Sequence, residues 1–308
     1  MIHTTSKQDK KCPSFEIFEV ITAQQLTVEK IQIINGDLIL GFSKSEQHVK
    51  IWSVSKRQAV FEHFFNQKKV NELLIIQNQN DLVAFGFLDK QVQIWSIKSE
   101  IGFSLQQELS YEQQIRKIKL SNNAFQLGIL HSNEQIRQLS KDQLSSNILY
   151  QSQQHIEDYC FFQNQTFLAI MQKRGFVSIF SIKSQKVIKQ WNAHQQGQCT
   201  IDGIDKDQII VTQAKDYSIK LWNMRSYSLL RVIDCRKISL SQYDIYNNTL
   251  LMSTFKPSLD IISLKTGKMI QSLEVDYPIL KIEIEFESNL IAILDYEFQI
   301  ILIRKKKY

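Results

Sequence analysis

Three residues in this chain have the side-chain types of a hydrolase triad: an imidazole at His194, a hydroxyl at Thr212 and a carboxylate at Asp216. In nucleophilic catalysis such groups serve as base, nucleophile and orienting acid. The same groups can instead satisfy one another by hydrogen bonds inside a packed protein, where they stabilise the fold. The elements that carry them decide between these two interpretations.

Those elements belong to a repeat. Seven times along the chain a short aliphatic strand ends in a similar way, and one residue in each ending serves as an anchor for alignment. The anchors are Trp52, Trp95, Leu139, Phe180, Trp222, Ile262 and Ile301. Subtracting successive positions gives spacings of about 43, 44, 41, 42, 40 and 39 residues, which is the period of four-stranded propeller blades.

A second column of residues keeps the same register. Six residues before each anchor, five of the seven positions hold an acidic or amide side chain of the kind that favours a tight turn between strands. The seven residues are Glu46, Asp89, Asn133, Arg174, Asp216, Lys256 and Asp295. Two columns in phase support the alignment of the repeats.

Each period has room for four short strands separated by polar turns. In the fifth repeat the pattern predicts strands at Cys199–Ile204, Gln208–Thr212, Ser218–Met224 and Leu229–Ile233. The sequence therefore predicts an all-β fold: a seven-bladed β-propeller of four-stranded antiparallel blades.

The last blade lacks an outer strand of its own. After Phe298–Ile303 the chain printed here continues only with the basic residues 304–307 and Tyr308. The segment Phe15–Thr22 alternates apolar and polar residues, so we expect it to complete this blade and close the ring. The expected organisation is a tail at residues 1–14, one propeller domain at 15–303 and a basic C-terminal tail at 304–308.

With these residues the chain resembles the WD-repeat (WD40) β-propeller family over nearly its full length, although its repeats are degenerate. Trp52, Trp95 and Trp222 stand where that family places its strand-ending tryptophan. The resemblance implies that the fifth blade retains a structural tetrad of four hydrogen-bonded side chains, which are His194, Thr212, Asp216 and Trp222. In the pattern of this family the hydroxyl is hydrogen-bonded by the indole N–H and the carboxylate by the imidazole. The resemblance therefore favours the structural interpretation of the triad and a protein that is not an enzyme.

Other signals for chemistry are weak. Gly36–Ser43 has the spacing of a phosphate-binding loop, but Phe42 stands where the lysine is required. His48, His63, His131 and His155 are scattered singly, without the paired spacing of a metal site. We therefore expect no catalytic residues, no metal, no cofactor and no small-molecule substrate.

The composition indicates an intracellular protein. The four cysteines, Cys12, Cys160, Cys199 and Cys235, form no CxxC pair, which suggests a reducing compartment, cytoplasmic or nuclear. Residues 1–12 are polar and predict no secretory signal, and no apolar stretch is long enough for a transmembrane segment. The net charge of +6 permits acidic partners without requiring nucleic acid.

Two surfaces could bind partners. The turns between third and fourth strands carry basic residues in every blade, which form a rim at one end of the ring: Lys56, Arg57, Lys98, Lys141, Lys183, Arg225, Lys265, Lys268 and residues 304–307. The opposite end displays residue types common at interface hot spots. The candidate partner surface there comprises His48, Tyr111, Lys173, Arg174, Tyr217, Lys256, Tyr277 and Tyr296.

The sequence thus predicts a non-catalytic scaffold that mediates protein–protein interactions within a multi-protein complex. The alternative is a protein that binds nucleic acid or an anionic membrane through the basic rim. The two hypotheses differ in salt dependence, because phosphate binding by several lysines weakens steeply as salt rises.

Overall fold

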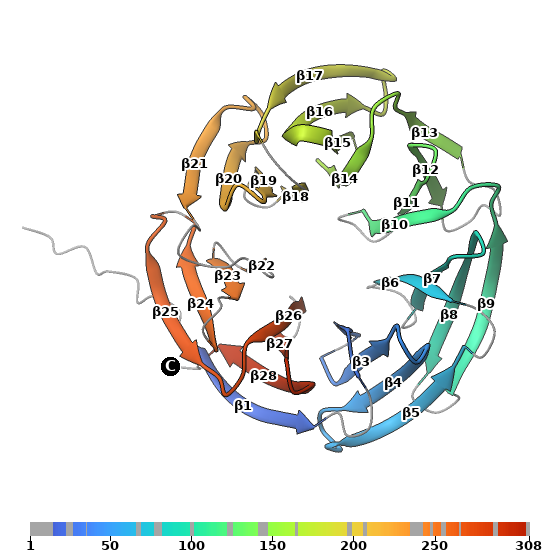
Figure 1. The fold of residues 1–308 in the computed structure, drawn as a ribbon, viewed down its shortest axis with the longest axis vertical. Coiled ribbons are helices and arrows are strands. Elements are labelled where there is room, and N and C mark those ends of the chain that lie inside the picture. The colour runs from blue at the N-terminus through green and yellow to red at the C-terminus, as the bar shows by residue number, and fades with distance from the viewer. Residues whose placement is uncertain are drawn as a thin grey trace, which may run out of the picture.

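The computed structural model describes residues 15–22, 27–34, 36–65, 69–76, 82–98, 102–121, 126–140, 147–163, 166–195, 199–205, 208–234, 243–246, 249–253, 257–264, 266–285 and 289–305. These residues form seven four-stranded antiparallel sheets arranged as a ring (Figure 1). The expected seven-bladed β-propeller is confirmed. We number the blades 1 to 7 in the order of their innermost strands and name the strands of each blade a to d from the centre outward.

The first four blades follow the chain in simple order. Blade 1 holds β2 (Lys30–Ile33), β3 (Leu38–Ser43), β4 (His48–Ser53) and β5 (Gln58–Phe64). Blade 2 holds β6 (Val70–Ile76), β7 (Leu82–Phe87), β8 (Gln91–Lys98) and β9 (Gly102–Ser110). Blade 3 holds β10 (Ile115–Leu120), β11 (Gln126–His131), β12 (Gln135–Ser140) and β13 (Asn147–Gln151). Blade 4 holds β14 (Ile156–Phe162), β15 (Phe167–Gln172), the short 3₁₀ turn η1 (Lys173–Gly175), β16 (Phe176–Ser181) and β17 (Lys186–Asn192).

The last three blades repeat this plan, and only the final one borrows a strand. Blade 5 holds β18 (Cys199–Ile204), β19 (Ile209–Ala214), β20 (Ser218–Asn223) and β21 (Leu229–Asp234). Blade 6 holds β22 (Tyr243–Tyr246), β23 (Thr249–Ser253), β24 (Ser258–Ser263) and β25 (Met269–Glu274). Blade 7 holds β26 (Ile279–Glu285), β27 (Leu290–Asp295), β28 (Gln299–Lys305) and, as its outer strand, β1 (Phe15–Thr22).

Burial changes with the position of a strand in its blade. The b strands β3 and β27 are buried along their whole length, because a neighbouring blade covers each of their faces. The d strand β17 is exposed at six of seven positions and carries Lys186 and Lys189 among its apolar residues. Charges on an outer edge discourage pairing with other chains.

The ring closes as the sequence predicts. In blade 7, β1 pairs antiparallel with β28, from Phe15 opposite Lys305 to Thr22 opposite Gln299, and Figure 1 shows these two strands side by side. The last strand extends through Arg304 and Lys305, two residues past the expected boundary at residue 303. The core at this seam joins side chains of β1, blade 7 and blade 1, including Ile21, Trp52 and Leu302.

The structure corrects one anchor. In blade 1 the pairing of β4 with the outer strand β5 skips one residue of β5 at the anchor, with Ile51 opposite Phe61 and Trp52 opposite Ala59. In blade 7 the same irregularity places Leu302 opposite Glu19 and Ile303 opposite Ile17. The anchor equivalent to Trp52 is therefore Ile303, and the sequence alignment, which used Ile301, was two residues out of register in this blade.

Backbone conformation supports this correction. A residue with positive φ lies in the turn between the second and third strands, five residues before the anchor. These residues are Gln47, Lys90, Glu134 and Tyr217 in blades 1, 2, 3 and 5, and Phe298 in blade 7. The turn residue equivalent to Asp216 is consequently Glu297 rather than Asp295. The sequence comparison missed the shift because isoleucine fills positions 300, 301 and 303 alike.

No helix among the described residues is both long and apolar enough to cross a membrane.

Candidate functional site

The ring has two faces with different connections. The b–c turns and the connectors between blades lie together on the face we call the upper face, where connector and turn backbones bond to one another. Examples are Tyr111 N–H to Lys90 O at 2.9 Å, Lys173 N–H to His155 O at 2.9 Å and Tyr296 N–H to Pro278 O at 3.0 Å. The a–b and c–d turns form the lower face, where Met224 N–H donates to Gln208 O at 2.8 Å.

The structure brings the four tetrad residues of blade 5 together. Trp222 Nε1–H donates to Thr212 Oγ1 at 2.9 Å, and Thr212 Oγ1 is 2.9 Å from His194 Nε2. His194 Nδ1 lies 2.9 Å from Asp216 Oδ2. The carboxylate only accepts, so the imidazole donates to it from Nδ1. In the neutral imidazole, which the lowered pKa of His194 favours, Nε2 is then the acceptor and the threonine hydroxyl donates to it.

Electrostatics favour the neutral form of this imidazole. Burial lowers the pKa of His194 by more than the nearby carboxylate of Asp216 raises it. Burial alone would raise the pKa of Asp216, but hydrogen bonds from Ser218 and His194 outweigh it, so the pKa is lowered. Thr212 is fully buried, with 0% of its area exposed. A hydroxyl that is buried and bonded at both ends stabilises packing, and it offers no approach for a substrate.

Other blades replace the tetrad with different contacts. In blade 2, Trp95 Nε1–H donates to Gln93 Oε1 at 3.0 Å, and Gln93 also bonds Glu108. In blade 1 the turn residue Glu46 accepts from the Thr27 hydroxyl at 2.6 Å. The hydrogen bonds from Thr27 outweigh burial and lower the pKa of Glu46. A donor on the connector thus pairs with the turn carboxylate in blades 1 and 5.

The candidate partner surface divides into two groups. Lys173, Arg174, Tyr217, Tyr277 and Tyr296 are exposed on the upper face. The tyrosines expose 54%, 40% and 58% of their area in that order.

Two members of the candidate surface do not lie open to a partner, which corrects the sequence interpretation. His48 is only 5% exposed because its ring stacks on Phe64 with centroids 3.8 Å apart. Tyr111 is half-buried and packs against His131 at 4.8 Å. Lys256 lies outside the described residues. Phe64 on the neighbouring strand β5 covers His48, and His131 at the end of β11 covers Tyr111, contacts that no single-residue pattern shows.

The basic rim is partly neutralised on the lower face. Arg57 Nη2 lies 2.9 Å from Glu19 Oε2, and Arg304 Nε lies 3.0 Å from Glu16 Oε1. Both acids belong to β1. Lys56, Lys183, Arg225 and Lys268 are exposed, whereas Lys141, Lys265 and residues 306–307, like the Lys98 side chain, lie outside the described part of the chain. The rim charge is therefore lower than the sequence suggests.

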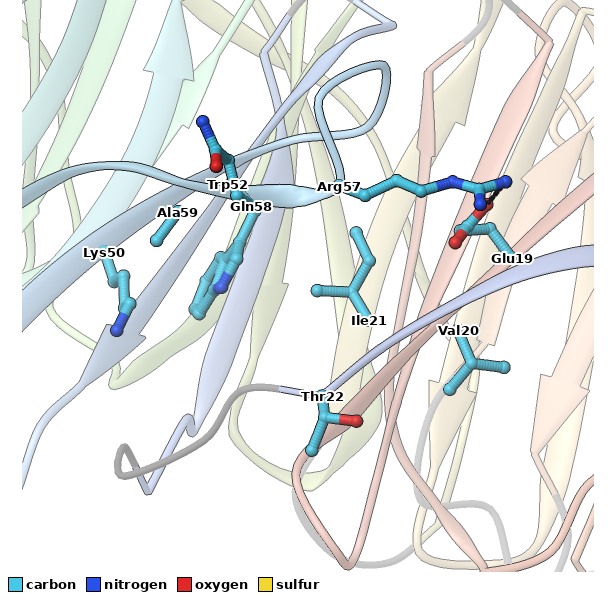
Figure 2. A pocket seen from close by; sticks show the side chains of 9 residues that line it. All are labelled: Glu19, Val20, Ile21, Thr22, Lys50, Trp52, Arg57, Gln58 and Ala59. Carbon is cyan, nitrogen blue, oxygen red and sulfur yellow. Dashed lines mark ion pairs between the residues drawn. The ribbon is translucent and has the colours of Figure 1, made fainter.

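A groove of about 340 Å³ follows the seam where the ring closes. Figure 2 shows Arg57 reaching over this groove to Glu19, with Ile21, Lys50 and Trp52 in its walls. Lys50 also pairs with Glu62 at 2.7 Å. The groove lies between β1 and blade 1. Arg57 and Glu19 pair across it and Lys50 is paired with Glu62, so its charged side chains offer little unmatched polarity to a ligand.

The sequence analysis missed an ionic cluster on the innermost strands. Lys119 Nζ contacts Asp158 Oδ2 at 3.0 Å and Asp202 Oδ1 at 2.8 Å, and Lys117 Nζ contacts Asp158 Oδ1 at 2.9 Å. Burial favours the neutral amine, but Asp158 and Asp202 outweigh it and hold the pKa of Lys119 well above its usual value. The sequence signal that could have revealed this cluster is the alternation of charged and apolar residues on the innermost strand of a blade. The cluster links blades 3, 4 and 5.

A second missed feature is a clasp between neighbouring blades. Gln47 Oε1 accepts from Val70 N–H at 2.6 Å, and Glu134 Oε2 accepts from Ile156 N–H at 2.6 Å. Both acceptors lie in b–c turns, and both donors begin the next blade. Arg116 donates to both Glu134 oxygens at 2.9 and 3.0 Å, which fixes that carboxylate in place.

Within the described ranges no group of three or more histidine, cysteine or acidic residues is placed to hold a metal ion. Cys160 and Cys199 are buried, and burial raises the pKa of both thiols. A buried thiol with a raised pKa carries little thiolate and is a poor nucleophile.

In comparisons with known proteins, no protein-family model and no curated protein matches the chain.

Proposed function

We propose that this chain is a non-catalytic WD-repeat scaffold, which binds protein partners through its upper face within a multi-protein complex in the cytoplasm or nucleus. The observation that carries the proposal is the set of exposed tyrosines on that face, Tyr217, Tyr277 and Tyr296. Tyrosine supplies a large, rigid and amphipathic contact area, and it is enriched where interfaces gain most of their binding energy.

The hydrogen bonds between turns and connectors support this function. They hold the upper-face loops on a closed ring of seven sheets, so a partner need not order these loops when it binds. Such preorganisation lowers the entropic cost of association. The tetrad of blade 5 adds to the rigidity beside Tyr217, because Asp216 and Ser218 flank this tyrosine and bond to each other.

The basic rim gives less support to nucleic-acid or membrane binding. Two of its arginines pair with acids of β1, and an ion-paired arginine attracts a phosphate less strongly.

The test compares two variants of the full chain expressed in its native cell. Replacing Arg174, Tyr217 and Tyr296 by alanine should reduce the recovery of co-purifying proteins, since truncating one interface hot spot costs on the order of 2 kcal/mol or more. The matched control reverses the rim charges Lys56, Lys183 and Lys268 to glutamate. Arg57 is left unchanged because it pairs with Glu19. Loss of partners from the rim variant alone would refute the proposal and favour the lower face.

A further inference from the structure

The connector before blade 7 differs chemically from the one before blade 5. Ala193 N–H bonds the turn carbonyl of Gly175 at 2.8 Å, and Val275 N–H bonds the turn carbonyl of Pro257 at 2.9 Å. The next residue is His194 in the first case and Asp276 in the second. Asp276 therefore occupies the connector position that holds the tetrad imidazole in blade 5.

The turn of blade 7 supplies a second carboxylate at the equivalent position. Glu297 follows Tyr296, as Asp216 follows Lys215, and each acid precedes the turn residue with φ of 58°. Blade 5 pairs its turn carboxylate with an imidazole N–H, and blade 1 pairs its own with the Thr27 hydroxyl. In blade 7 the connector offers another acid where those blades offer a donor.

A third acid lies beneath this position. Asp295 is 0% exposed, and its Oδ1 accepts from Glu297 N–H at 3.0 Å and Gln299 N–H at 2.8 Å. Its Oδ2 is buried and has no hydrogen-bond partner among the residues that the structure describes. Burial raises the pKa of Asp295, and the charges of Glu297 and Asp276 raise it further, against the lowering effect of the two backbone donors. Blade 7 thus concentrates negative potential at its upper end.

Two exposed aromatic rings border these acids. Tyr277 follows Asp276, and Tyr296 lies between Asp295 and Glu297. The bond from Tyr296 N–H to Pro278 O, at 3.0 Å, holds the turn against the connector, so both tyrosines belong to one small surface. Tyrosine faces attract cations, and neighbouring carboxylates add Coulombic attraction.

From this surface, defined by Asp276, Tyr277, Tyr296 and Glu297, we propose that blade 7 binds a lysine- or arginine-bearing segment of a protein partner. The inference rests on the proposed function and adds the chemistry of the partner. Charge complementarity identifies the occupant. The chain has a net charge of +6, which repels a basic segment from the molecule as a whole, so an acidic patch bordered by tyrosines is the place where such a segment is attracted.

The same face separates charges of opposite sign. Lys173, Arg174 and Lys215 are exposed over blades 4 and 5, and no ion pair to a described residue neutralises them. Nucleic acid is a poor fit for blade 7, since its phosphates would meet Asp276 and Glu297. A polypeptide with a short basic stretch can pair with the acids of blade 7 without contacting Lys173, Arg174 or Lys215.

The experiment measures fluorescence anisotropy of a labelled twelve-residue peptide with four arginines alternating with glycine and serine. It uses the full chain at low and at physiological salt. Asp276→Asn combined with Glu297→Gln should weaken binding about tenfold, which corresponds to about 1.4 kcal/mol. The matched control, Asp89→Asn combined with Glu112→Gln, removes two exposed acids from the same face at blades 2 and 3 and should bind like the wild type.

Aromatic variants test the second part of the surface. Tyr277→Phe with Tyr296→Phe should keep the affinity, because the ring faces remain, whereas alanine at both positions should lower it. Equal affinity for the neutralised blade 7 variant and the wild type would overturn the inference, as would no binding by the wild type or tighter binding of a glutamate version of the peptide. Under any of these results, partner loss in the Arg174, Tyr217 and Tyr296 variant would still support the proposed scaffold function.

Discussion

At the scale of single residues, the tetrad of blade 5 joins four side chains in one continuous chain of hydrogen bonds. Thr212 Oγ1 accepts from the indole of Trp222 and donates to His194 Nε2, and His194 Nδ1–H donates to Asp216, so each polar atom of this buried path has a partner inside the protein. The carboxylate is further held by Ser218, whose hydroxyl donates at 2.7 Å and whose N–H donates at 3.0 Å.

Replacing Asp216 by alanine should therefore destabilise the fold. The imidazole Nδ1–H and the Ser218 donors would lose their acceptor, at a cost of about 1 to 3 kcal/mol in the free energy of unfolding. Urea denaturation followed by tryptophan fluorescence measures this change. Lys215→Ala, an exposed neighbour, is the control and should stay within about 0.5 kcal/mol of the wild type. An unaltered midpoint in the Asp216 variant would show that the network adds no stability.

The buried histidines predict that stability falls as the pH is lowered. Burial lowers the pKa of His48, His63, His131 and His194. Below the ordinary histidine value of about 6.5 the unfolded chain binds more protons than the folded one, so the free energy of unfolding decreases with decreasing pH. The contribution of these histidines to stability is fully present above that pH.

Thermal melting at pH 7.5 and pH 5.5 tests this dependence. The melting temperature should be lower at pH 5.5, each histidine contributing at most about 1.4 kcal/mol per pH unit. Because Asp295 has a raised pKa, its contribution has the opposite sign and belongs to more acidic conditions. The melting temperature of His194→Gln should depend less on pH, and a wild-type melting temperature equal at both pH values would contradict the prediction.

At the scale of elements, the innermost strands do more than enclose the axis of the ring. Asp158 on β14 accepts from two lysines of β10 and from Ile201 N–H of β18 at 3.0 Å. Burial by itself would raise the pKa of Asp158, but Lys119 and Lys117 outweigh it, so the pKa is lowered. A single carboxylate thereby fixes the relative positions of three blades.

Asp158→Asn should destabilise the protein by about 3 to 5 kcal/mol, since it removes the buried carboxylate and leaves its two part-buried lysines with too little opposing charge. Calorimetric unfolding measures the loss. Asp202→Asn provides the comparison, because that side chain is 48% exposed and contributes one half-solvated ion pair, for which about 1 kcal/mol or less is expected. Similar destabilisation by both substitutions would mean that burial does not control the strength of the cluster.

At the scale of the whole molecule, closure depends on the pairing of β1 with β28. Phe15 begins this strand and is buried, and its N–H donates to Gln271 Oε1 at 2.9 Å while its carbonyl accepts from Gln271 Nε2 at 3.0 Å. The N-terminal strand therefore contacts blade 6 as well as blades 7 and 1. Its removal would expose the backbone of β28 and the apolar seam.

Deleting residues 1–22 should cause aggregation, whereas deleting residues 1–13 should be tolerated because β1 remains intact. Size-exclusion chromatography with light scattering distinguishes monomer from aggregate in the two truncations. Equal monomer fractions would show that β1 is dispensable for closure.

The sequence by itself determined the number of blades, their four-stranded plan and the strand that closes the ring, because a periodic pattern of apolar residues and turns reports local geometry. It also brought His194, Thr212, Asp216 and Trp222 into one network through the resemblance to WD repeats. Local pattern failed in blade 7, where a run of isoleucines hid the shift from Ile301 to Ile303.

Only the tertiary structure decided which charges and rings remain open to solvent. The ion pairs of Arg57 and Arg304 with β1, the inward stacking of His48 and the meeting of Lys119 with Asp158 join residues far apart in the sequence or on different strands. Such contacts depend on strand register and blade packing, which set distances of a few ångströms between side chains. Spacing along one chain carries no measure of those distances.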